Sequence, residues 1–295
     1  MTAQLLDGNA FLEAVKADLR QRLDRLRAQG VTPGLGTILV GDDPNSASYV
    51  ARKHRNCEEL GMASLHQALP ATASQEDLHA AIRRFNDDPA VDAFLVQLPL
   101  PKGLDEEAAL LTVDPDKDVD GLHPVNLGRL VMGVPAPVAC TPAGIQALLV
   151  HHGVAIEGRH VVIVGRGLTV GRPLALLLAL KRPNANAAVT VVHTGVAELG
   201  AFTRRADILV AAAGVPSLIT PEMVQPGAVV VSAGITWAEG KRLLPDVDEA
   251  VAEVAGWITP RLGGVGPTTI AMLLSNAVRA AERWTSAGAP APSTR

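Results

Sequence analysis

The segment Val161–Leu178 restricts the fold of this 295-residue chain more than any other part of its sequence. Its letters, VVIVGRGLTVGRPLALLL, predict a buried strand, a glycine-rich turn and an apolar helix, in that order. A strand that leads through a short turn into a helix is typical of parallel sheets, where a helix carries the chain back to the next strand. Other apolar strands alternate with helices before and after this segment, so we predict an α/β fold with mostly parallel sheets covered on both faces.

The alternation divides into two sets of strands and helices, which predict two domains. An amphipathic helix over residues 11–26 begins the first set, and a Thr-Pro helix start at Thr141 begins the second. The Pro- and Gly-rich stretch 132–137 between them is a candidate hinge. A late helix over residues 269–284 could pack on either domain, and the small, polar tail 287–295 is expected to be unfolded.

Composition excludes two classes of partner. The chain has 26 Lys and Arg against 30 Asp and Glu, and the resulting net charge of −4 supplies no basic field to attract nucleic acid. Three Trp, one Tyr and four Phe offer few surfaces on which single-stranded bases could stack. No apolar run approaches the roughly 18 residues of a membrane span, and the N-terminus shows no cleavage pattern. We therefore expect neither a nucleic-acid nor a membrane partner.

The cysteines, histidines and acidic residues show no metal-binding spacing. Cys57 and Cys140 lie far apart and fit no Cys-x-x-Cys pattern, and the eight histidines contain no His-Glu-x-x-His pair. The acidic run 116–120 imitates the start of a calcium loop, but Leu127 occupies the position that needs a bidentate glutamate. We predict no metal site, and the cysteine usage indicates a reduced, cytoplasmic protein.

The glycines of the first segment suggest a phosphate-binding loop. Gly165, Gly167 and Gly171 are spaced one residue longer than the usual dinucleotide fingerprint, so the strand and helix around them carry the prediction. Glycines let the backbone approach a pyrophosphate, to which the N-terminus of the following helix offers unpaired N–H groups. A strand-to-helix turn without a ligand is the alternative interpretation.

The expected nucleotide is NADP rather than NAD. An NAD site usually has an acidic residue at the end of the second strand, whereas here that strand ends in the residues 193–195, His-Thr-Gly. No carboxylate there would repel a 2′-phosphate, and Arg166 in the glycine turn could pair with one. A solvated loop arginine is the alternative for Arg166.

Three residues in the first half of the chain are candidates for proton transfer. Tyr49 precedes Lys53 by four residues, so the two share a helix face, and a lysine desolvated beside an aromatic ring loses part of its preference for the charged form. Spacing alone favours a surface pair. Gln97 ends the apolar strand 93–97, where open α/β sheets place ligand groups, but an amide there could equally bond to the loop backbone.

Six motifs in order resemble those of the bifunctional methylenetetrahydrofolate dehydrogenase/cyclohydrolase family, and together they span nearly the whole chain. They are GDDPNSASYVARKHRNCEELGM (41–62), FLVQLPLP (94–101), PDKDVDGLHPVNLGRL (115–130), CTPAGI (140–145), the glycine segment (161–178) and GGVGPTTIAMLL (263–274).

The resemblance implies a reaction and a domain arrangement. Members of the family use NADP to oxidise 5,10-methylene-tetrahydrofolate to the 5,10-methenyl cation, which water then opens to 10-formyl-tetrahydrofolate. The implied arrangement is an N-terminal α/β folate and catalytic domain of residues 1–137 plus 269–286, a C-terminal Rossmann-like NADP-binding domain of residues 138–268, a cleft between them, and a homodimer.

The resemblance also implies roles for particular residues. Lys53 matches the catalytic lysine, Tyr49 its helix neighbour near the pterin, and Gln97 the group that contacts the lysine amine. Asp120 matches the carboxylate that binds the pterin ring. Further folate contacts are implied for Leu98, Gly264 and Pro267, and nucleotide contacts for Gly165, Arg166, Gly167, Thr169, Val170, Gly171, Thr194, Ile235 and Thr269.

Two positions depart from the family pattern near the expected nucleotide. Gly167 stands where the family usually has serine, and Gly195 stands where a basic residue often follows the second strand. Arg166 and Thr194 are therefore left to contact the 2′-phosphate. The competing hypotheses are another NADP-linked oxidoreductase on a similar two-domain frame and a folate- or nucleotide-binding protein without activity. The intact proton-transfer residues argue against the second, because a binding protein does not need them.

Overall fold

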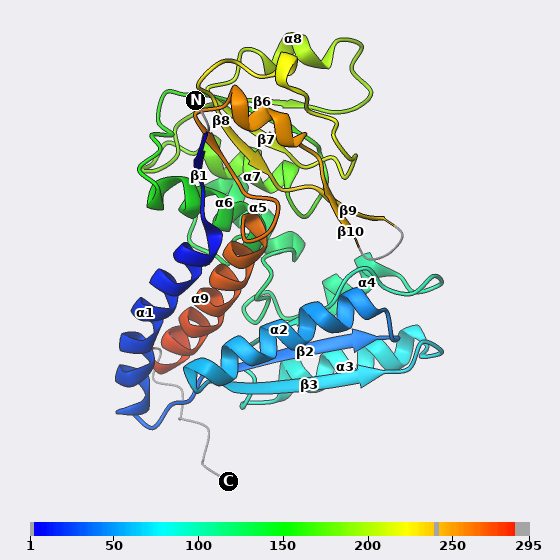
Figure 1. Ribbon diagram of the computed structural model, residues 1–295. Coiled ribbons are helices and arrows are strands. Elements are labelled where there is room, and N and C mark those ends of the chain that lie inside the picture. The colour runs from blue at the N-terminus through cyan, green and yellow to red at the C-terminus, as the bar shows by residue number, and fades with distance from the viewer. Residues whose placement is uncertain (1–2, 239–241, 287–295) are drawn as a thin grey trace. The chain divides into compact units, whose positions relative to one another are not determined.

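The computed structural model describes residues 3–238 and 242–286 and is drawn in Figure 1. Contacts divide the chain into two compact units, and the boundary falls within the helices α1 (Gly8–Arg27) and α9 (Val265–Ser286). The six-stranded unit contains the described residues of Met1–Glu13, Leu130–Val134 and Val138–Met272, and the three-stranded unit those of Ala14–Arg129, Pro135–Pro137 and Leu273–Arg295. The tail 287–295, predicted to be unfolded, lies outside the described residues.

The six-stranded unit is built on a sheet whose strands are all parallel, in the order β1-β11-β8-β7-β5-β6. The strands are β1 (Gln4–Leu5), β5 (His160–Val164), β6 (Ala188–Val192), β7 (Ile208–Ala211), β8 (Val229–Ser232) and β11 (Trp257–Ile258). The helices around the sheet are α6 (Cys140–His151), α7 (Gly171–Ala179) and α8 (Leu199–Thr203), with short 3₁₀ turns η1 (Pro221–Met223) and η3 (Glu249–Glu253). The inner strands are continuous runs of Val, Ile, Leu and Ala, which a parallel sheet covered on both faces requires.

A two-stranded antiparallel ribbon, β9 (Ile235–Ala238) and β10 (Arg242–Pro245), follows β8 in the chain. Ile235 pairs with Pro245 at the base of the ribbon, so the chain just before β9 lies beside the chain just after β10. Figure 1 shows the ribbon extending away from the six-stranded sheet.

The N-terminal residues differ from the predicted domain boundary. The prediction assigned residues 1–13 to the folate domain, but β1 pairs with β11, and Leu6 N donates to the Ile258 carbonyl at 2.9 Å. These backbone bonds place the described residues up to Glu13 with the six-stranded unit. A strand of two residues leaves no periodic signal in a sequence, so this pairing could not be expected from the residues alone.

The three-stranded unit has a parallel sheet in the order β3-β2-β4. Its elements are β2 (Gly34–Val40), α2 (Pro44–Leu60), β3 (Ala63–Leu69), α3 (Gln75–Asp87), β4 (Ala93–Val96) and α4 (Glu106–Thr112), and α5 (Pro124–Met132) begins in it. Side chains of a strand alternate between the two faces of its sheet. On β2, Thr37 bonds to His54 of α2, whereas Ile38 packs with Leu78 of α3. The two helices therefore cover opposite faces.

The structure confirms the predicted fold class, an α/β chain of two units with parallel sheets. No helix within residues 3–238 and 242–286 is long and apolar enough to cross a membrane.

Candidate active site

The helix α2 places Tyr49 and Lys53 one turn apart. Its N-cap is Asp43, whose side chain accepts a hydrogen bond from Ser46 N at 2.8 Å, and proline occupies the first helical turn. The cap and the proline start the helix at Pro44. Tyr49 is therefore well inside the helix, and the Lys53 Nζ lies 5.0 Å from the centroid of its ring.

Lys53 is buried and its amine contacts the end of β4. The residue is 3% exposed, and its Nζ donates a hydrogen bond to Gln97 Oε1 at 3.1 Å. Gln97 Nε2 in turn donates to the Leu98 carbonyl at 2.7 Å, which leaves the amide oxygen directed at the amine. Burying an amine without a polar partner costs free energy of folding, so this hydrogen bond stabilises the buried position of Lys53. The amide carries no charge, so it orients the amine without a counter-ion.

The structure thus brings Tyr49, Lys53 and Gln97 together from residues far apart in the sequence. The pair that spacing alone assigned to the surface is instead anchored by a side chain 44 residues away. Gln97 lies just past the carboxyl end of β4, where its backbone N donates to the Ile38 carbonyl at 2.8 Å. Its side chain bonds both to the lysine amine and to the Leu98 carbonyl, so the bond to the loop backbone is present, and a ligand-binding role stays a prediction.

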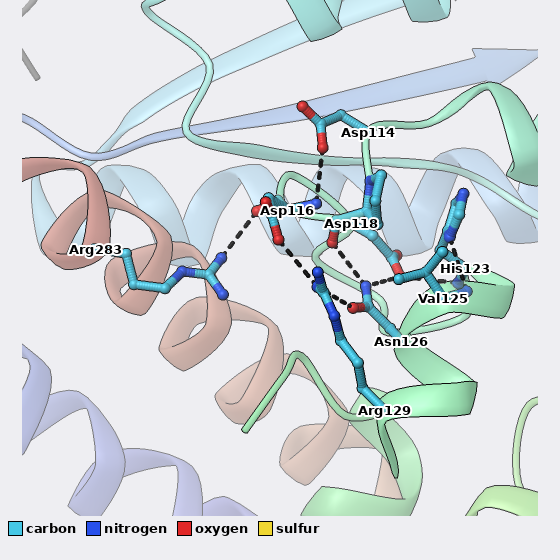
Figure 2. Close-up of polar contacts among 9 residues, drawn as sticks. Asp114, Asp116, Asp118, His123, Val125, Asn126, Arg129 and Arg283 are labelled. Carbon is cyan, nitrogen blue, oxygen red and sulfur yellow. Dashed lines mark hydrogen bonds and ion pairs between the residues drawn. The ribbon is translucent and has the colours of Figure 1, made fainter. Parts of the chain in front are cut away.

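A buried carboxylate organises the turn that carries Asp120 (Figure 2). Asp118 is 5% exposed and accepts hydrogen bonds from Gly121 N at 3.0 Å, His123 N at 2.8 Å and Asn126 Nδ2 at 3.0 Å. Burial raises the pKa of the Asp118 carboxyl, and these donors oppose the rise. The backbone from residue 118 to 123 therefore wraps around one carboxylate, with Asp120 in the middle of the wrap.

A second layer of contacts supports this turn, as Figure 2 shows. Asn126 also donates to the Pro115 carbonyl, and Arg129 bonds both Asn126 Oδ1 and Asp116. Arg283 of α9 donates to the Asp116 carbonyl at 2.8 Å. The sequence interpretation missed the role of Asp118 because it compared the acidic run with a calcium loop. The useful signal was the Asp-x-x-Gly spacing, which is typical of a carboxylate that accepts from the backbone of its own turn.

Two of the three glycines in the predicted phosphate loop are required by close backbone contacts. Gly165 has φ +134°, and a Cβ there would lie 2.2 Å from the Ala212 carbonyl oxygen. A Cβ on Gly171 would lie 2.2 Å from the Gly165 carbonyl oxygen. A Cβ on Gly167, in contrast, would meet no described atom within 4 Å. The loop therefore has the shape that brings backbone close to a ligand, at the first and third glycine.

The helix that follows this loop starts without a side-chain cap. The N-cap of α7 is Val170, which forms no side-chain hydrogen bond to the first turn. Unpaired N–H groups at a helix start attract anions such as a pyrophosphate. In this first turn Arg172 N already donates to the Gly167 carbonyl at 3.1 Å and Pro173 has no N–H. The close glycine contacts are therefore the feature that fits a dinucleotide, which is the ligand the sequence predicted here.

The remaining predicted nucleotide residues are distributed around the carboxyl ends of the strands. Arg166, Thr169 and Thr194 are exposed there, and Ile235 is 49% exposed at the start of β9. Thr269 Oγ1 lies 3.0 Å from Thr141 Oγ1, so that threonine is already engaged with α6.

Two of the residues for which folate contacts are implied are less accessible. Gly264 and Pro267 are buried, and a Cβ on Gly264 would lie 2.8 Å from the Pro260 carbonyl oxygen. Gly264 itself restricts Gly8, because a Cβ on Gly8 would lie 1.8 Å from the Gly264 carbonyl oxygen. Close backbone contacts therefore require glycine at both positions, 8 and 264.

A cavity of about 310 Å³ lies at the amino ends of the strands of the six-stranded sheet. Its lining includes His152, Arg159, Asp207 and Trp257, at the amino ends of strands. Ligands of open α/β sheets bind at the carboxyl ends, so this cavity is separate from the predicted nucleotide site. Across residues 3–238 and 242–286, no cluster of three or more His, Cys, Asp or Glu could bind a metal.

Comparison with known proteins gives two family models that together cover most of the chain. The first is described as tetrahydrofolate dehydrogenase/cyclohydrolase, catalytic domain, and matches residues 6–120. The second is the NAD(P)-binding domain of the same family and matches residues 139–285. Bifunctional protein FolD of Syntrophotalea carbinolica is 63% identical over 282 residues, which are 96% of this chain and 97% of that protein. Bifunctional protein FolD 1 of Salinispora tropica is 57% identical, over 98% of this chain and 94% of that protein.

Solved structures give the same result. The bifunctional enzyme FolD of Campylobacter jejuni superposes with a TM-score of 0.91 at 41% identity, covering 95% of this chain and 99% of that one. The methylenetetrahydrofolate dehydrogenase-cyclohydrolase of Trypanosoma brucei, complexed with NADP cofactor and an inhibitor, gives 0.90 at 38% identity over 97% and 99%.

A parallel sheet with a glycine turn, joined in one chain to a second α/β unit with a buried lysine, defines the class: a dinucleotide-dependent enzyme of two units. The chain belongs to the bifunctional tetrahydrofolate dehydrogenase/cyclohydrolase family. It is accordingly a bifunctional enzyme, a methylenetetrahydrofolate dehydrogenase and a methenyltetrahydrofolate cyclohydrolase.

Proposed function

We propose that Lys53 is the catalytic residue of both reactions, with Gln97 and Tyr49 orienting its amine and Asp120 binding the pterin ring. The observation that carries this proposal is the hydrogen bond from Lys53 Nζ to Gln97 Oε1 at 3.1 Å inside a buried site. A lysine on the protein surface needs no such partner, and the amide of Gln97 places no charge beside the amine.

In the oxidation, bound NADP⁺ would supply the acceptor for a hydride from the methylene carbon of 5,10-methylene-tetrahydrofolate. Hydride loss leaves a positive charge on the carbon and the two nitrogens that flank it. A fixed positive charge beside that carbon would raise the barrier, so the amine must be able to approach it uncharged. Gln97 orients the amine without adding charge.

In the hydrolysis, a water molecule attacks the methenyl carbon and must lose a proton as its oxygen forms the new bond. The neutral amine of Lys53 accepts that proton. The ring then opens when the bond from the carbon to one nitrogen breaks, that nitrogen takes up the hydroxyl proton, and the carbon becomes the formyl group. The proton gained by Lys53 is the one proton that the overall hydrolysis releases.

Asp120 accepts two hydrogen bonds from the aminopyrimidine edge of the pterin, a geometry that a carboxylate offers and a hydroxyl does not. The support for this role is the turn around Asp118, which fixes the backbone on both sides of Asp120. Leu98, Gly264 and Pro267 contribute backbone to the folate site.

The nucleotide is NADP, which the glycine turn after β5 binds through its backbone at the start of α7. Arg166 and Thr194 contact the 2′-phosphate that distinguishes NADP from NAD. The other contacts come from Gly165, Gly167, Thr169, Val170, Gly171, Ile235 and Thr269.

The proposal includes a homodimer in the cytoplasm that binds neither nucleic acid nor membrane. The net charge of −4 supports the absence of a nucleic-acid partner, and the buried Cys57 and Cys140, which form no disulfide, support a reducing compartment. Light scattering of the purified enzyme should give twice the mass of one chain, and the mass of one chain would refute the dimer.

The test of the catalytic proposal is Lys53→Met, assayed for both reactions with NADP and NAD in parallel. We expect hydrolysis of methenyl-tetrahydrofolate to fall by about 100-fold or more, the usual contribution of a positioned proton acceptor. Folate binding, measured by titration, should stay measurable. Lys102→Met is the matched control, because Lys102 is an exposed lysine of the same unit. An unchanged hydrolysis rate in Lys53→Met would refute the role of Lys53.

A further inference from the structure

Asp246 is a completely buried carboxylate with one oxygen occupied and the other unpartnered. It follows β10, its exposed fraction is 0%, and its Oδ2 accepts hydrogen bonds from Ala213 N at 2.6 Å and Gly214 N at 2.9 Å. Within residues 3–238 and 242–286, Oδ1 has no hydrogen-bond partner. Burial raises the pKa of the Asp246 carboxyl, and the backbone donors oppose the rise. Burying a carboxylate oxygen without a hydrogen-bond partner costs free energy of folding, which indicates that this carboxylate has a role.

The two N–H groups belong to the loop that follows β7, next to the glycine turn. A Cβ on Gly165 would lie 2.2 Å from the Ala212 carbonyl oxygen, so this loop and the glycine turn are in direct backbone contact. Ala212 N also donates to the Val164 carbonyl at 2.8 Å. The loop over residues 212–214 therefore packs against the glycine turn, and the Asp246 carboxylate accepts the hydrogen bonds of two N–H groups in this loop.

A second piece of backbone restricts the carboxylate from the opposite side. A Cβ on Gly234 would lie 1.9 Å from Asp246 Oδ2, so a larger residue at 234 would displace the carboxylate. The Gly234 carbonyl accepts from Asp246 N at 3.2 Å, and Thr236 Oγ1 donates to the Gly214 carbonyl at 2.9 Å. The Asp246 carboxylate and the Thr236 hydroxyl thus both join the base of the ribbon β9–β10 to the loop after β7.

We propose that Asp246 is a positioning residue for the dinucleotide: it fixes the backbone of residues 212–214 against Gly165 and does not touch the nucleotide itself. This inference rests on the proposed NADP site at the glycine turn. It predicts that a lesion at Asp246 weakens NADP binding while the hydrolysis, which needs no nucleotide, continues.

The experiment compares Asp246→Ala and Asp246→Asn with the control Asp248→Asn. Asp248 is a neighbouring acid whose side chain caps η3 through Ala250 N, away from the loop. Asparagine at 246 keeps an oxygen that can accept both N–H groups, whereas alanine leaves two donors without a partner.

Three readouts separate positioning from general stability. For Asp246→Ala we expect amide exchange at residues 213 and 214 to accelerate by about tenfold or more, as for amides that lose their acceptor. The dissociation constant for NADP, measured by calorimetry without folate, should rise by about tenfold or more, and methenyl hydrolysis without nucleotide should stay within about twofold. Asp246→Asn should remain within about threefold of wild type in all three readouts.

Wild-type NADP affinity in Asp246→Ala, or a parallel loss of NADP binding and hydrolysis, would overturn the inference. If Asp246→Ala does not fold, Gly234→Ala provides the second variant, because it displaces the carboxylate and should give the same selective loss of NADP binding. A wild-type enzyme that fails to bind NADP would instead refute the proposed nucleotide site, so the two failures are distinguishable.

Discussion

The two units of this enzyme build their sites in different ways. In the three-stranded unit, side chains from α2 and β4 meet at the buried amine of Lys53, which bonds to Gln97. In the six-stranded unit, the site is backbone: glycines at 165 and 171 that tolerate no Cβ, and a helix start with no side-chain cap. Side chains can move protons, whereas backbone N–H groups can only bind a negative group. Damage to the first site should therefore affect both reactions, and damage to the second only the oxidation.

The largest effect on the proposed folate site is expected from Asp120→Ala. Removing two charge-assisted hydrogen bonds to the pterin should weaken folate binding by about 100-fold, since each such bond contributes about 1.5 kcal/mol or more. Both reactions should suffer alike at low folate concentration. Fluorescence titration with a folate substrate measures the loss, with the exposed Glu107→Ala as control. Wild-type affinity would remove Asp120 from the site.

A smaller and one-sided effect is expected from Gly165→Ala. The added Cβ would meet the Ala212 carbonyl, so the turn must shift and NADP should bind about tenfold more weakly. Gly128→Ala is the control, because its Cβ would also meet no described atom within 4 Å and Gly128 has no proposed nucleotide contact. Steady-state kinetics should show a higher KM for NADP and unchanged hydrolysis in Gly165→Ala. Equal losses of NADP binding in the two glycine variants, or a loss of hydrolysis in Gly165→Ala, would contradict the proposed difference between the two sites.

The smallest effect concerns stability near α2 at acid pH. His54 Nε2 and His66 Nδ1 both lie 2.9 Å from the Oγ1 of Thr37, which is completely buried. Desolvation, followed by the nearby His66, lowers the pKa of His54 from its ordinary value of 6.5, with Lys53 adding to the decrease and Glu58 opposing it. The unfolded chain therefore binds the proton more readily than the folded one.

The sign of the pH dependence follows from that difference. The contribution of His54 is complete above about pH 6.5 and is lost as the pH falls through the lowered pKa of the folded state. Urea unfolding at a series of pH values should show less of this loss in His54→Gln than in wild type. The same pH dependence in both proteins would contradict the assignment.

The sequence predicted the elements with strong periodicity and left out the contacts that depend on tertiary structure. The strand and helix around Gly165, and the apolar strand before Gln97, are local patterns that survive packing. That Lys53 bonds to Gln97 could not be derived from spacing, because the pair is 44 residues apart and depends on how α2 lies on the sheet. The resemblance of motifs supplied what periodicity could not.

Two further differences have simple physical reasons. The pairing of β1 with β11 was missed because a strand of two residues shows no alternation. The carboxylate of Asp118 was assigned no role because the acidic run was compared with a calcium loop, whereas its partners are mainly backbone N–H groups of its own turn. In both cases the stabilising contacts are made by the main chain, to which a pattern of side chains is insensitive.

The central claim, that the amine of Lys53 acts by exchanging a proton, is tested most directly by Lys53→Arg. Arginine keeps a long stem and a positive charge, but it stays protonated throughout the accessible pH range. The account predicts that methenyl-tetrahydrofolate hydrolysis by this variant falls by about 100-fold or more at every pH from about 6 to 9, as in Lys53→Met. A Lys53→Arg enzyme that keeps more than about one tenth of the wild-type hydrolysis rate would show that charge alone suffices, and would contradict the account.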